Sequence, residues 1–224
     1  DVGIFRELMR NVELAEKDEN ALFDLIQQKS VAGLKVQAGQ LGLPAKLCEQ
    51  LVTLPTLCGT SAIIEDALEL FSGAAQIEAR LENLAKLYGA ITDRFENIDV
   101  YFDLSELRGY GYHTGIVFAG YIEGERQCIA KGGRYDDVGE VFGRARSATG
   151  FDMDAKALLG VVGFNQKEGK RVLAKPANNS ATEKSRWKKA AELRKEGYIV
   201  LESLAEGQSC DLELTNKDGE WRLS

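Results

Sequence analysis

The stretch that decides the fold, residues 115–131, reads GIVFAGYIEGERQCIAK. Two apolar segments, residues 115–122 and 127–131, flank the turn Glu123-Gly124-Glu125, which is the pattern of two strands joined by a hairpin. Residues 148–154 predict one more strand, followed by a short helix. Because strands joined directly by hairpins pair antiparallel, the pattern indicates an antiparallel sheet rather than a doubly wound parallel one.

The segment before this hairpin is helical in pattern. Apolar residues recur at helical spacing, and we expect residues 18–97 to form a helical insertion. Its longest helix is expected over residues 77–95, and because this run is short and contains Gly89, it should pack on its own domain rather than form a coiled coil. Asp18 is expected to cap the first helix, and Pro44 to occupy the first position of a later one.

The segment after residue 164 has a different pattern. We expect residues 1–164 to form one α+β domain and residues 165–224 to form a small α/β appendage. In the appendage, the pattern predicts a strand, a helix, a strand and a hairpin, at residues 171–174, 182–196, 198–201 and 211–221.

Composition places the chain among globular proteins and excludes several classes. The 224 residues are 44% hydrophobic and 28% charged, and 28 basic against 35 acidic side chains give a net charge of −7. An acidic chain is a poor candidate for binding nucleic acid, which depends on phosphate neutralisation. Without an apolar run of roughly 18 residues or a secretory signal, we expect no membrane span and a cytoplasmic location. Because the chain begins with Asp1 rather than Met, we expect it to be a fragment.

The cysteines and the single histidine do not form a metal-binding pattern. Cys48, Cys58, Cys128 and Cys210 lie far apart without a C-x-x-C pair, and His113 is the only histidine. We therefore expect no metal and no cofactor, and we expect the cysteines to be reduced, mostly buried thiols.

The candidate site lies in two glycine-rich motifs that flank the hairpin. The first, residues 107–115, reads LRGYGYHTG, and the second, residues 131–136, reads KGGRYD. Neither has the glycine spacing of a dinucleotide-binding or phosphate-binding loop. Instead, glycines that allow close approach of the backbone alternate with Arg, Tyr and His, whose flat side chains carry polar ends.

These residue types match the polar groups of an amino-acid ligand. Arg108 can hold a carboxylate as a fork, and Asp136 can accept a hydrogen bond from an amine. Each feature also has a structural interpretation: Gly132-Gly133 is expected to break the second strand of the hairpin, and a lone histidine such as His113 is more often packed than catalytic. The two motifs around one hairpin favour a binding pocket.

The two motifs resemble the histidine-specific motifs of the histidyl-tRNA synthetases, a class II family in which they frame a histidine pocket on an antiparallel sheet. The fuller string, with VFGRAR at residues 141–146 and ATGF at residues 148–151, is more similar to a paralogous family, the regulatory subunits of ATP phosphoribosyltransferase. Residues 1–160 resemble the second half of such a subunit. The resemblance therefore implies that an N-terminal half is missing from this chain.

The chain departs from the synthetase pattern at several positions. Gly111 stands where a synthetase carries an acidic residue, His113 where it carries a second tyrosine, and Ala119 where its strand motif ends in Glu. In the last strand–helix motif, the arginine that grips ATP aligns with Ala157. Since electrostatic stabilisation is usually the largest catalytic term, the resemblance implies a synthetase fold without synthetase activity.

The resemblance implies a class II aminoacyl-tRNA synthetase-like antiparallel sheet and a noncatalytic regulatory subunit. This subunit would assemble with the catalytic subunit of ATP phosphoribosyltransferase in the first step of histidine biosynthesis, and it would form a dimer as a full-length chain. Histidine would be its feedback ligand, bound by Arg108, Tyr112, His113, Gly132, Gly133, Arg134, Tyr135 and Asp136. Two alternatives stay open: a catalytic-core fragment of a histidyl-tRNA synthetase, and an interaction protein that keeps the fold but has lost the ligand.

Overall fold

A computed structural model describes the chain except for residues 125, 138–142, 163–168, 178, 204–208 and 218. The chain divides into two compact units, which are described separately. Unit 1 comprises residues 1–89 and 99–162, and unit 2 comprises residues 90–98 and 163–224. None of the helices in the described residues is long and apolar enough to cross a membrane.

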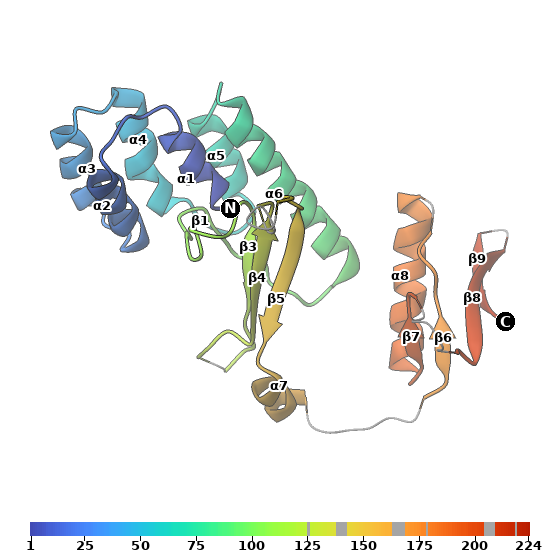
Figure 1. The fold of residues 1–224 in the computed structure, drawn as a ribbon. Helices are drawn as coiled ribbons and strands as arrows, with labels where there is room; N and C mark the ends of the chain where they lie inside the picture. Colours follow the sequence, from blue (N-terminus) through green and yellow to red (C-terminus); the bar gives the residue numbers. More distant parts are fainter. Residues whose placement is uncertain (125, 138–142, 163–168, 178, 204–208, 218) are drawn as a thin grey trace. The chain divides into compact units, whose positions relative to one another are not determined.

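Unit 1 contains a group of helices around a common apolar core (Figure 1). Its helices are α1 (Gly3–Met9), α2 (Glu16–Gln27), α3 (Val31–Gln40), α4 (Ala45–Thr53), α5 (Ile63–Leu70) and most of α6 (Ala75–Arg94), and the 3-10 turn η1 (Leu54–Thr56) follows α4. Residues 90–94 of α6 belong to unit 2. Different helices contribute fully buried side chains to one core, among them Phe5, Leu22, Leu34, Leu51 and Leu81. The long helix expected over residues 77–95 is α6.

Three details of the helical region differ from the expectation. Asp18 does not cap α2 but lies in its first turn, where a negative charge still favours the helix dipole. Pro44 immediately precedes α4 instead of occupying its first position. The pattern does not predict α3, whose two glycines lower its helical propensity. Helix α3 forms because Leu34 and Ala38 are fully buried in the tertiary structure.

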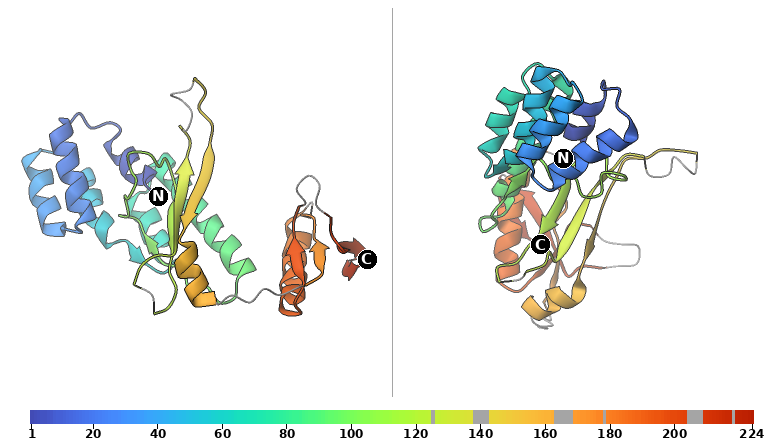
Figure 2. Two further views of the ribbon diagram at one scale, coloured as in Figure 1. Left: turned by 60° about the horizontal axis from the view of Figure 1, so that its bottom comes forward. Right: turned by 90° about the vertical axis from the view of Figure 1, so that its left-hand side faces the viewer.

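The predicted antiparallel sheet is present in unit 1. The strands β3 (Val117–Gly120), β4 (Ala130–Tyr135) and β5 (Ala148–Met153) pair antiparallel in the order β3-β4-β5, and α7 (Ala155–Val162) follows β5. Figure 2 shows these strands side by side. A separate two-stranded sheet pairs β1 (Cys58–Gly59) with β2 (Phe102–Asp103). The expected hairpin is therefore confirmed, although its turn includes residue 125, which lies outside the described residues.

The expected break of the second strand at Gly132-Gly133 is wrong. Both glycines lie inside β4, where Gly132 pairs with Phe118 and Gly133 pairs with Val117 of β3. A Cβ atom on Gly132 would lie only 2.3 Å from the carbonyl oxygen of Gly150 on β5. Glycine stands here because neighbouring groups approach too closely to admit a side chain, and not because the strand ends.

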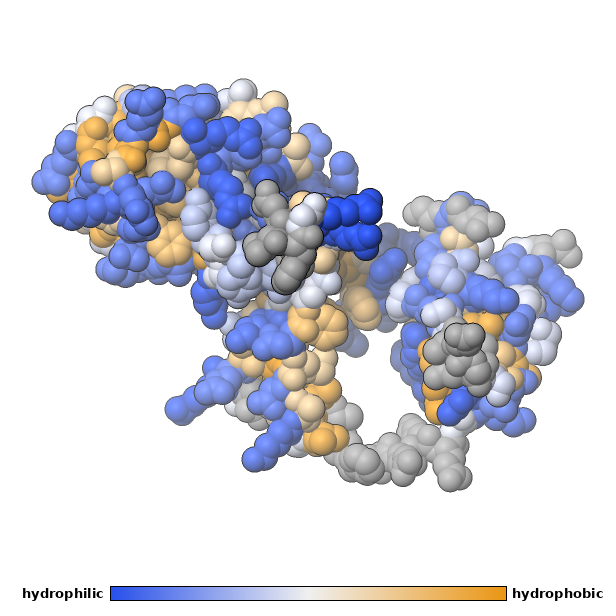
Figure 3. Space-filling model, in the orientation of Figure 1, coloured by the Kyte–Doolittle hydropathy of each residue, from blue (hydrophilic) through white to orange (hydrophobic). Residues whose placement is uncertain are grey.

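The pairing register gives this sheet two different faces. Phe118 and Phe151, which both pair with Gly132, share one face and are 46% and 65% exposed. Figure 3 shows apolar side chains over β5 and α7. Because successive residues of a strand point to opposite faces, Gly133 and Tyr135 lie on the other face. The candidate site described below is built on that second face.

The cysteines are less buried than expected. Cys48, Cys58, Cys128 and Cys210 are all free thiols, and each is half-buried. The expectation of free thiols is confirmed, whereas the expectation that they are mostly buried is wrong.

Unit 2 contains a small sheet and one long helix. Its elements are β6 (Arg171–Leu173), α8 (Ser180–Lys195), β7 (Ile199–Leu201), β8 (Leu212–Lys217) and β9 (Glu220–Leu223). The strand order is β7-β6-β8-β9, with β6 parallel to β7 and β8, and β8 antiparallel to β9. The strand, helix, strand and hairpin predicted for this region are confirmed. Their apolar core comprises Val172, Ala174, Ala190, Leu193, Val200 and Leu214.

A charged side chain is fully buried in unit 2. Arg186 of α8 is 1% exposed, and its guanidinium donates to the Glu183 carboxylate (2.9 Å) and to the carbonyl oxygen of Ala174 (2.8 Å). Glu183 also accepts hydrogen bonds from the Ala177 N–H and the Trp187 indole. The hydrogen bonds from Arg186 and these other donors lower the pKa of Glu183 from 4.5 to about 2.

We predict that Glu183→Gln destabilises the protein by on the order of 3 kcal/mol, because it removes the carboxylate that is hydrogen-bonded to the buried Arg186 and leaves, among the described residues, only Glu202, at 3.8 Å, to balance the charge. The low pKa of Glu183 adds stability above pH 4.5 that is lost as the pH falls towards about 2, and the variant should lack this acid-dependent loss. Urea unfolding across this pH range measures both effects.

The matched control is Glu192→Gln, because Glu192 pairs with Lys189 at the surface. This change should cost less than about 1 kcal/mol. Equal effects of the two substitutions would contradict the assigned role of the buried pair.

Candidate functional site

A tight turn at Gly109 shapes the first motif. Gly109 has a φ of 73°, in the left-handed region that favours glycine, and its carbonyl oxygen accepts the N–H groups of Tyr112 (2.9 Å) and His113 (2.7 Å). The Arg6 guanidinium of α1 donates to the carbonyl oxygens of Tyr110 (2.8 Å) and His113 (3.2 Å). The turn is therefore held through its backbone, by a helix that the motif pattern does not indicate.

Three aromatic rings from the two motifs come together. The centroid of the His113 ring lies 4.3 Å from that of Tyr112 and 4.7 Å from that of Tyr135. The two tyrosine rings stack with centroids 6.0 Å apart. Tyr112 is 64% exposed, whereas His113 is 6% exposed. The site thus combines a buried imidazole with two phenol rings, of which one faces solvent.

His113 is enclosed by glycine backbone and not by hydrogen-bond partners. A Cβ atom on Gly109 would lie 2.3 Å from Nδ1, and one on Gly133 would lie 2.6 Å from Nε2. Both ring nitrogens are buried, and within the described part of the chain neither has a hydrogen-bond partner. Because leaving a buried polar group unpaired costs roughly 1–3 kcal/mol, the His113 ring is packed here at an energetic cost.

Asp136 is engaged by neighbouring polar groups. Its carboxylate accepts the Thr114 hydroxyl (2.8 Å) and the Arg134 guanidinium (2.9 Å), and the Thr114 hydroxyl accepts the Asp136 N–H (2.9 Å). Hydrogen bonds from Ser147, Thr114 and Arg134 hold the pKa of Asp136 below its ordinary value. The carboxylate that the sequence assigns to a ligand amine is therefore ionised and paired, and an incoming amine has to share it.

Arg108 pairs with a carboxylate of its own chain. Its Nε and Nη2 donate to Glu106 at 3.0 and 2.6 Å, and its side chain is 67% exposed. The hydrogen bonds from Arg108 to Glu106 raise the pKa of the guanidinium above its ordinary value. The Arg108 guanidinium, which the sequence analysis assigns to a ligand carboxylate, is therefore paired with the Glu106 carboxylate instead. The motif pattern does not indicate Glu106, because a spacing of two residues in a loop has no fixed geometry.

The predicted site residues fall into separate groups. The aromatic cluster and its backbone contact comprise Tyr112, His113, Gly133 and Tyr135. Arg134 pairs with Asp136 and Arg108 pairs with Glu106. The register places Gly132 on the opposite face of β4 from Gly133. Val141 and Phe142 of the extended motif lie outside the described residues.

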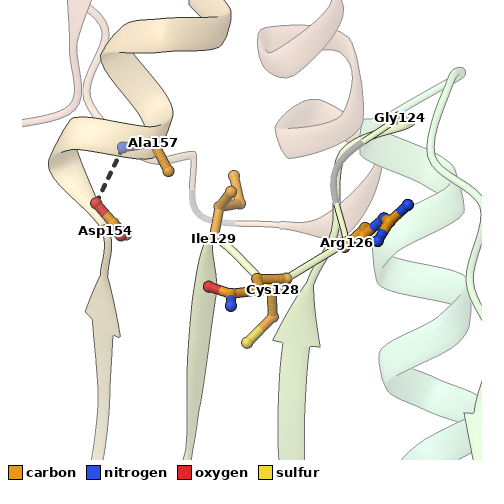
Figure 4. A pocket seen from close by; sticks show the side chains of 7 residues that line it. Gly124, Arg126, Cys128, Ile129, Asp154 and Ala157 are labelled. Atoms are coloured by element: carbon orange, nitrogen blue, oxygen red, sulfur yellow. Dashed lines mark hydrogen bonds between the residues drawn. The ribbon is translucent and has the colours of Figure 1, made fainter.

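A separate cavity of about 420 Å³ lies near the other end of β4 (Figure 4). Its lining residues are Gly124, Arg126, Gln127, Cys128, Ile129, Asp154 and Ala157. Asp154 accepts the N–H groups of Lys156 (3.0 Å) and Ala157 (2.9 Å) at the start of α7. Figure 4 shows the Arg126 side chain directed away from Ala157. The cavity wall therefore presents the methyl group of Ala157 beside the carboxylate of Asp154.

Comparison with known proteins finds one matching family model and a group of similar sequences. The model of the histidyl-tRNA synthetase family matches residues 1–158. ATP phosphoribosyltransferase regulatory subunits of Pseudomonas aeruginosa (strain LESB58) and Ectopseudomonas mendocina (strain ymp) are 37% and 39% identical over 231 and 232 residues. Both matches cover 100% of this chain and 57% of the relative. The chain thus spans little more than half the length of these relatives.

Two solved structures resemble the fold. A crystal structure from Bacillus halodurans C, described as an ATP phosphoribosyltransferase regulatory subunit/histidyl-tRNA synthetase, has a TM-score of 0.59 at 25% identity and covers 93% of this chain and 53% of its own. Histidyl-tRNA synthetase from Nostoc sp. PCC 7120 has a TM-score of 0.53 at 16% identity, with coverage of 92% and 52%. The prediction of an α+β, class II synthetase-like fold is confirmed.

We predict that Gly133→Ala destabilises the protein by about 1–3 kcal/mol through overpacking. The new Cβ would lie 2.5 Å from Cδ2 of His113 and 2.9 Å from the carbonyl oxygen of Ile116, so the ring or the strand has to move. Urea unfolding measures the loss.

Gly111→Ala is the matched control, since a Cβ on Gly111 would meet no atom within 4 Å. This change should stay within about 0.5 kcal/mol of the unmodified protein. Similar losses for both variants would show that close packing of Gly133 on His113 does not limit stability.

Proposed function

Because the chain belongs to the histidyl-tRNA synthetase family, we propose that it acts as a noncatalytic member, in a regulatory subunit of ATP phosphoribosyltransferase. The observation that carries this proposal is the cavity beside α7, whose wall has the uncharged Ala157 at the position where the sequence resemblance expects the ATP-gripping arginine. The names of relatives that match the entire chain support the same role. Since the chain spans only part of those relatives, the proposal concerns the whole protein.

The proposed ligand is free histidine, bound at the aromatic site. Tyr112 and Tyr135 would contact the imidazole, close to the backbone of Gly133. Arg108 would exchange Glu106 for the ligand carboxylate, and Asp136 would pair with the ligand amino group. Arg134, which pairs with Asp136, and the Gly132-Gly133 backbone would complete the site. His113 belongs to the same site, and its part is developed below.

The proposed partner is the catalytic subunit of ATP phosphoribosyltransferase, which joins ATP to phosphoribosyl pyrophosphate. The full-length chain would also pair with a second copy, and the assembly would work in the cytoplasm. Histidine can inhibit the assembly only if it binds unequally to two states of the complex. The regulatory chain would therefore transmit the binding of histidine to the catalytic subunit without catalysing a reaction itself.

A second candidate function is that of a histidyl-tRNA synthetase core. The match of the synthetase family model over residues 1–158 favours it. Ala157 counts against it, because an uncharged side chain cannot stabilise the triphosphate of ATP. The two candidates differ in whether histidine is activated after it has bound.

The experiment combines the full-length protein with the purified catalytic subunit. We expect the two to co-elute in size-exclusion chromatography, and we expect histidine to inhibit ATP phosphoribosyl transfer by the complex. Calorimetry should show histidine binding, while pyrophosphate exchange with histidine and ATP should be absent. Histidine-dependent exchange would identify a synthetase, and failure to assemble would refute the regulatory role.

We predict that Arg108→Lys weakens histidine binding by about 1–3 kcal/mol, because lysine cannot form the two-pronged contact with a carboxylate. Calorimetry with the full-length variant measures the change. Arg126→Lys is the control, because Arg126 lines the separate cavity. Unchanged affinity in a folded Arg108→Lys variant would make Arg108 a structural partner of Glu106 and not a ligand contact.

A further inference from the structure

The site already holds an imidazole ring, that of His113. We call the space around this ring the imidazole slot and define it by Gly109, Tyr112, Gly133 and Tyr135. Both tyrosine rings lie within 4.7 Å of the His113 ring, centroid to centroid. The two glycines place backbone directly against the ring nitrogens, and any side chain at either position would fill the slot. The slot therefore fits a flat five-membered ring.

The slot holds this ring by its shape alone. In the described part of the chain, neither ring nitrogen of His113 forms a hydrogen bond, although each can donate or accept one. A ring that rotated into solvent would gain hydrogen bonds to water at both nitrogens. The His113 ring is thus closely packed, but its two nitrogens lack hydrogen-bond partners among the described residues as long as the ring stays in the slot.

The His113 backbone is anchored independently of its ring. Its N–H donates to the carbonyl oxygen of Gly109, and its carbonyl oxygen accepts the Arg6 guanidinium. The imidazole can therefore leave the slot by rotation of the side chain, without unfolding the turn.

We propose that the His113 side chain is a displaceable internal occupant of the imidazole slot, and that free histidine competes with it for that slot. This inference rests on the proposed function, because it takes histidine as the ligand. A free histidine carries a carboxylate and an ammonium group that Arg108 and Asp136 at the site can pair with. The His113 side chain has neither group, so the free amino acid gains contacts that the internal ring lacks. His113 would thereby set the histidine concentration at which the protein responds.

The test uses the full-length protein with two substitutions, His113→Ala and His113→Phe. His113→Ala empties the slot. The apparent affinity for histidine is the intrinsic affinity multiplied by the fraction of molecules whose slot is open. If the slot is open in about one molecule in ten of the unmodified protein and in every molecule of His113→Ala, the substitution should tighten histidine binding about tenfold. His113→Phe fills the slot with a ring that has no polar group to release, so histidine binding should weaken at least about tenfold.

Imidazole is the second probe in the calorimeter. It should bind His113→Ala and should bind the unmodified protein at least about tenfold more weakly, because the slot is then occupied. Imidazole binding to His113→Ala together with no histidine binding by any variant would support the slot and refute the proposed ligand. Histidine binding that His113→Ala weakens would support the ligand and refute the displaceable ring.

Urea unfolding separates these effects from misfolding. His113→Phe puts a larger ring into the slot and removes two unpaired nitrogens, so overpacking opposes the gain, and urea unfolding shows that the variant tested for binding is folded. If His113→Ala fails to fold, His113→Phe decides the question alone. Unchanged or tighter histidine binding by folded His113→Phe would overturn the proposal.

Discussion

The close approach of strand β4 to the turn at Gly109 is the constraint on which the site depends. Gly133 has no side chain, so the His113 ring lies directly against the strand. Gly109 takes a positive φ and meets the same ring from the first motif. A side chain at either glycine would separate the two motifs. The glycines of both motifs thus serve one contact, and the tyrosines on either side of that contact form the walls of the site.

The charged groups around this contact are paired within the chain. Glu106 holds Arg108, and Thr114 and Arg134 hold Asp136. The ion pair of Arg186 in unit 2 has a structural role, because this buried guanidinium cannot reach water and has to keep its carboxylate partner. Arg108 is instead two-thirds exposed, and exposed ion pairs contribute little stability. Exchange of its partner for a ligand carboxylate is therefore inexpensive.

The aromatic cluster and the cavity beside α7 lie at opposite ends of one strand. Tyr135 ends β4 beside the aromatic cluster, and Ile129 precedes the strand at the cavity that Ala157 lines. At a rise of about 3.3 Å per residue, the two ends are roughly 20 Å apart. A substitution at the cavity therefore need not disturb the rings at the other end of the strand. That division is what the proposed regulatory role requires of a synthetase fold.

The sequence by itself determined the hairpin, the order of elements in unit 2 and the membership of Tyr112, His113 and Tyr135 in two related motifs. These follow from alternation, helical periodicity and turn residues, which act over short distances along the chain. Only the tertiary structure decided that Gly132-Gly133 lies inside β4, that α3 is a helix, and that Arg108 forms an ion pair with Glu106. The burial of both His113 nitrogens without partners is also a tertiary result. The results for α3, β4 and His113 depend on which distant groups approach one another, and a local pattern carries no information about such contacts. The Arg108–Glu106 pair depends on a loop conformation that a spacing of two residues does not fix.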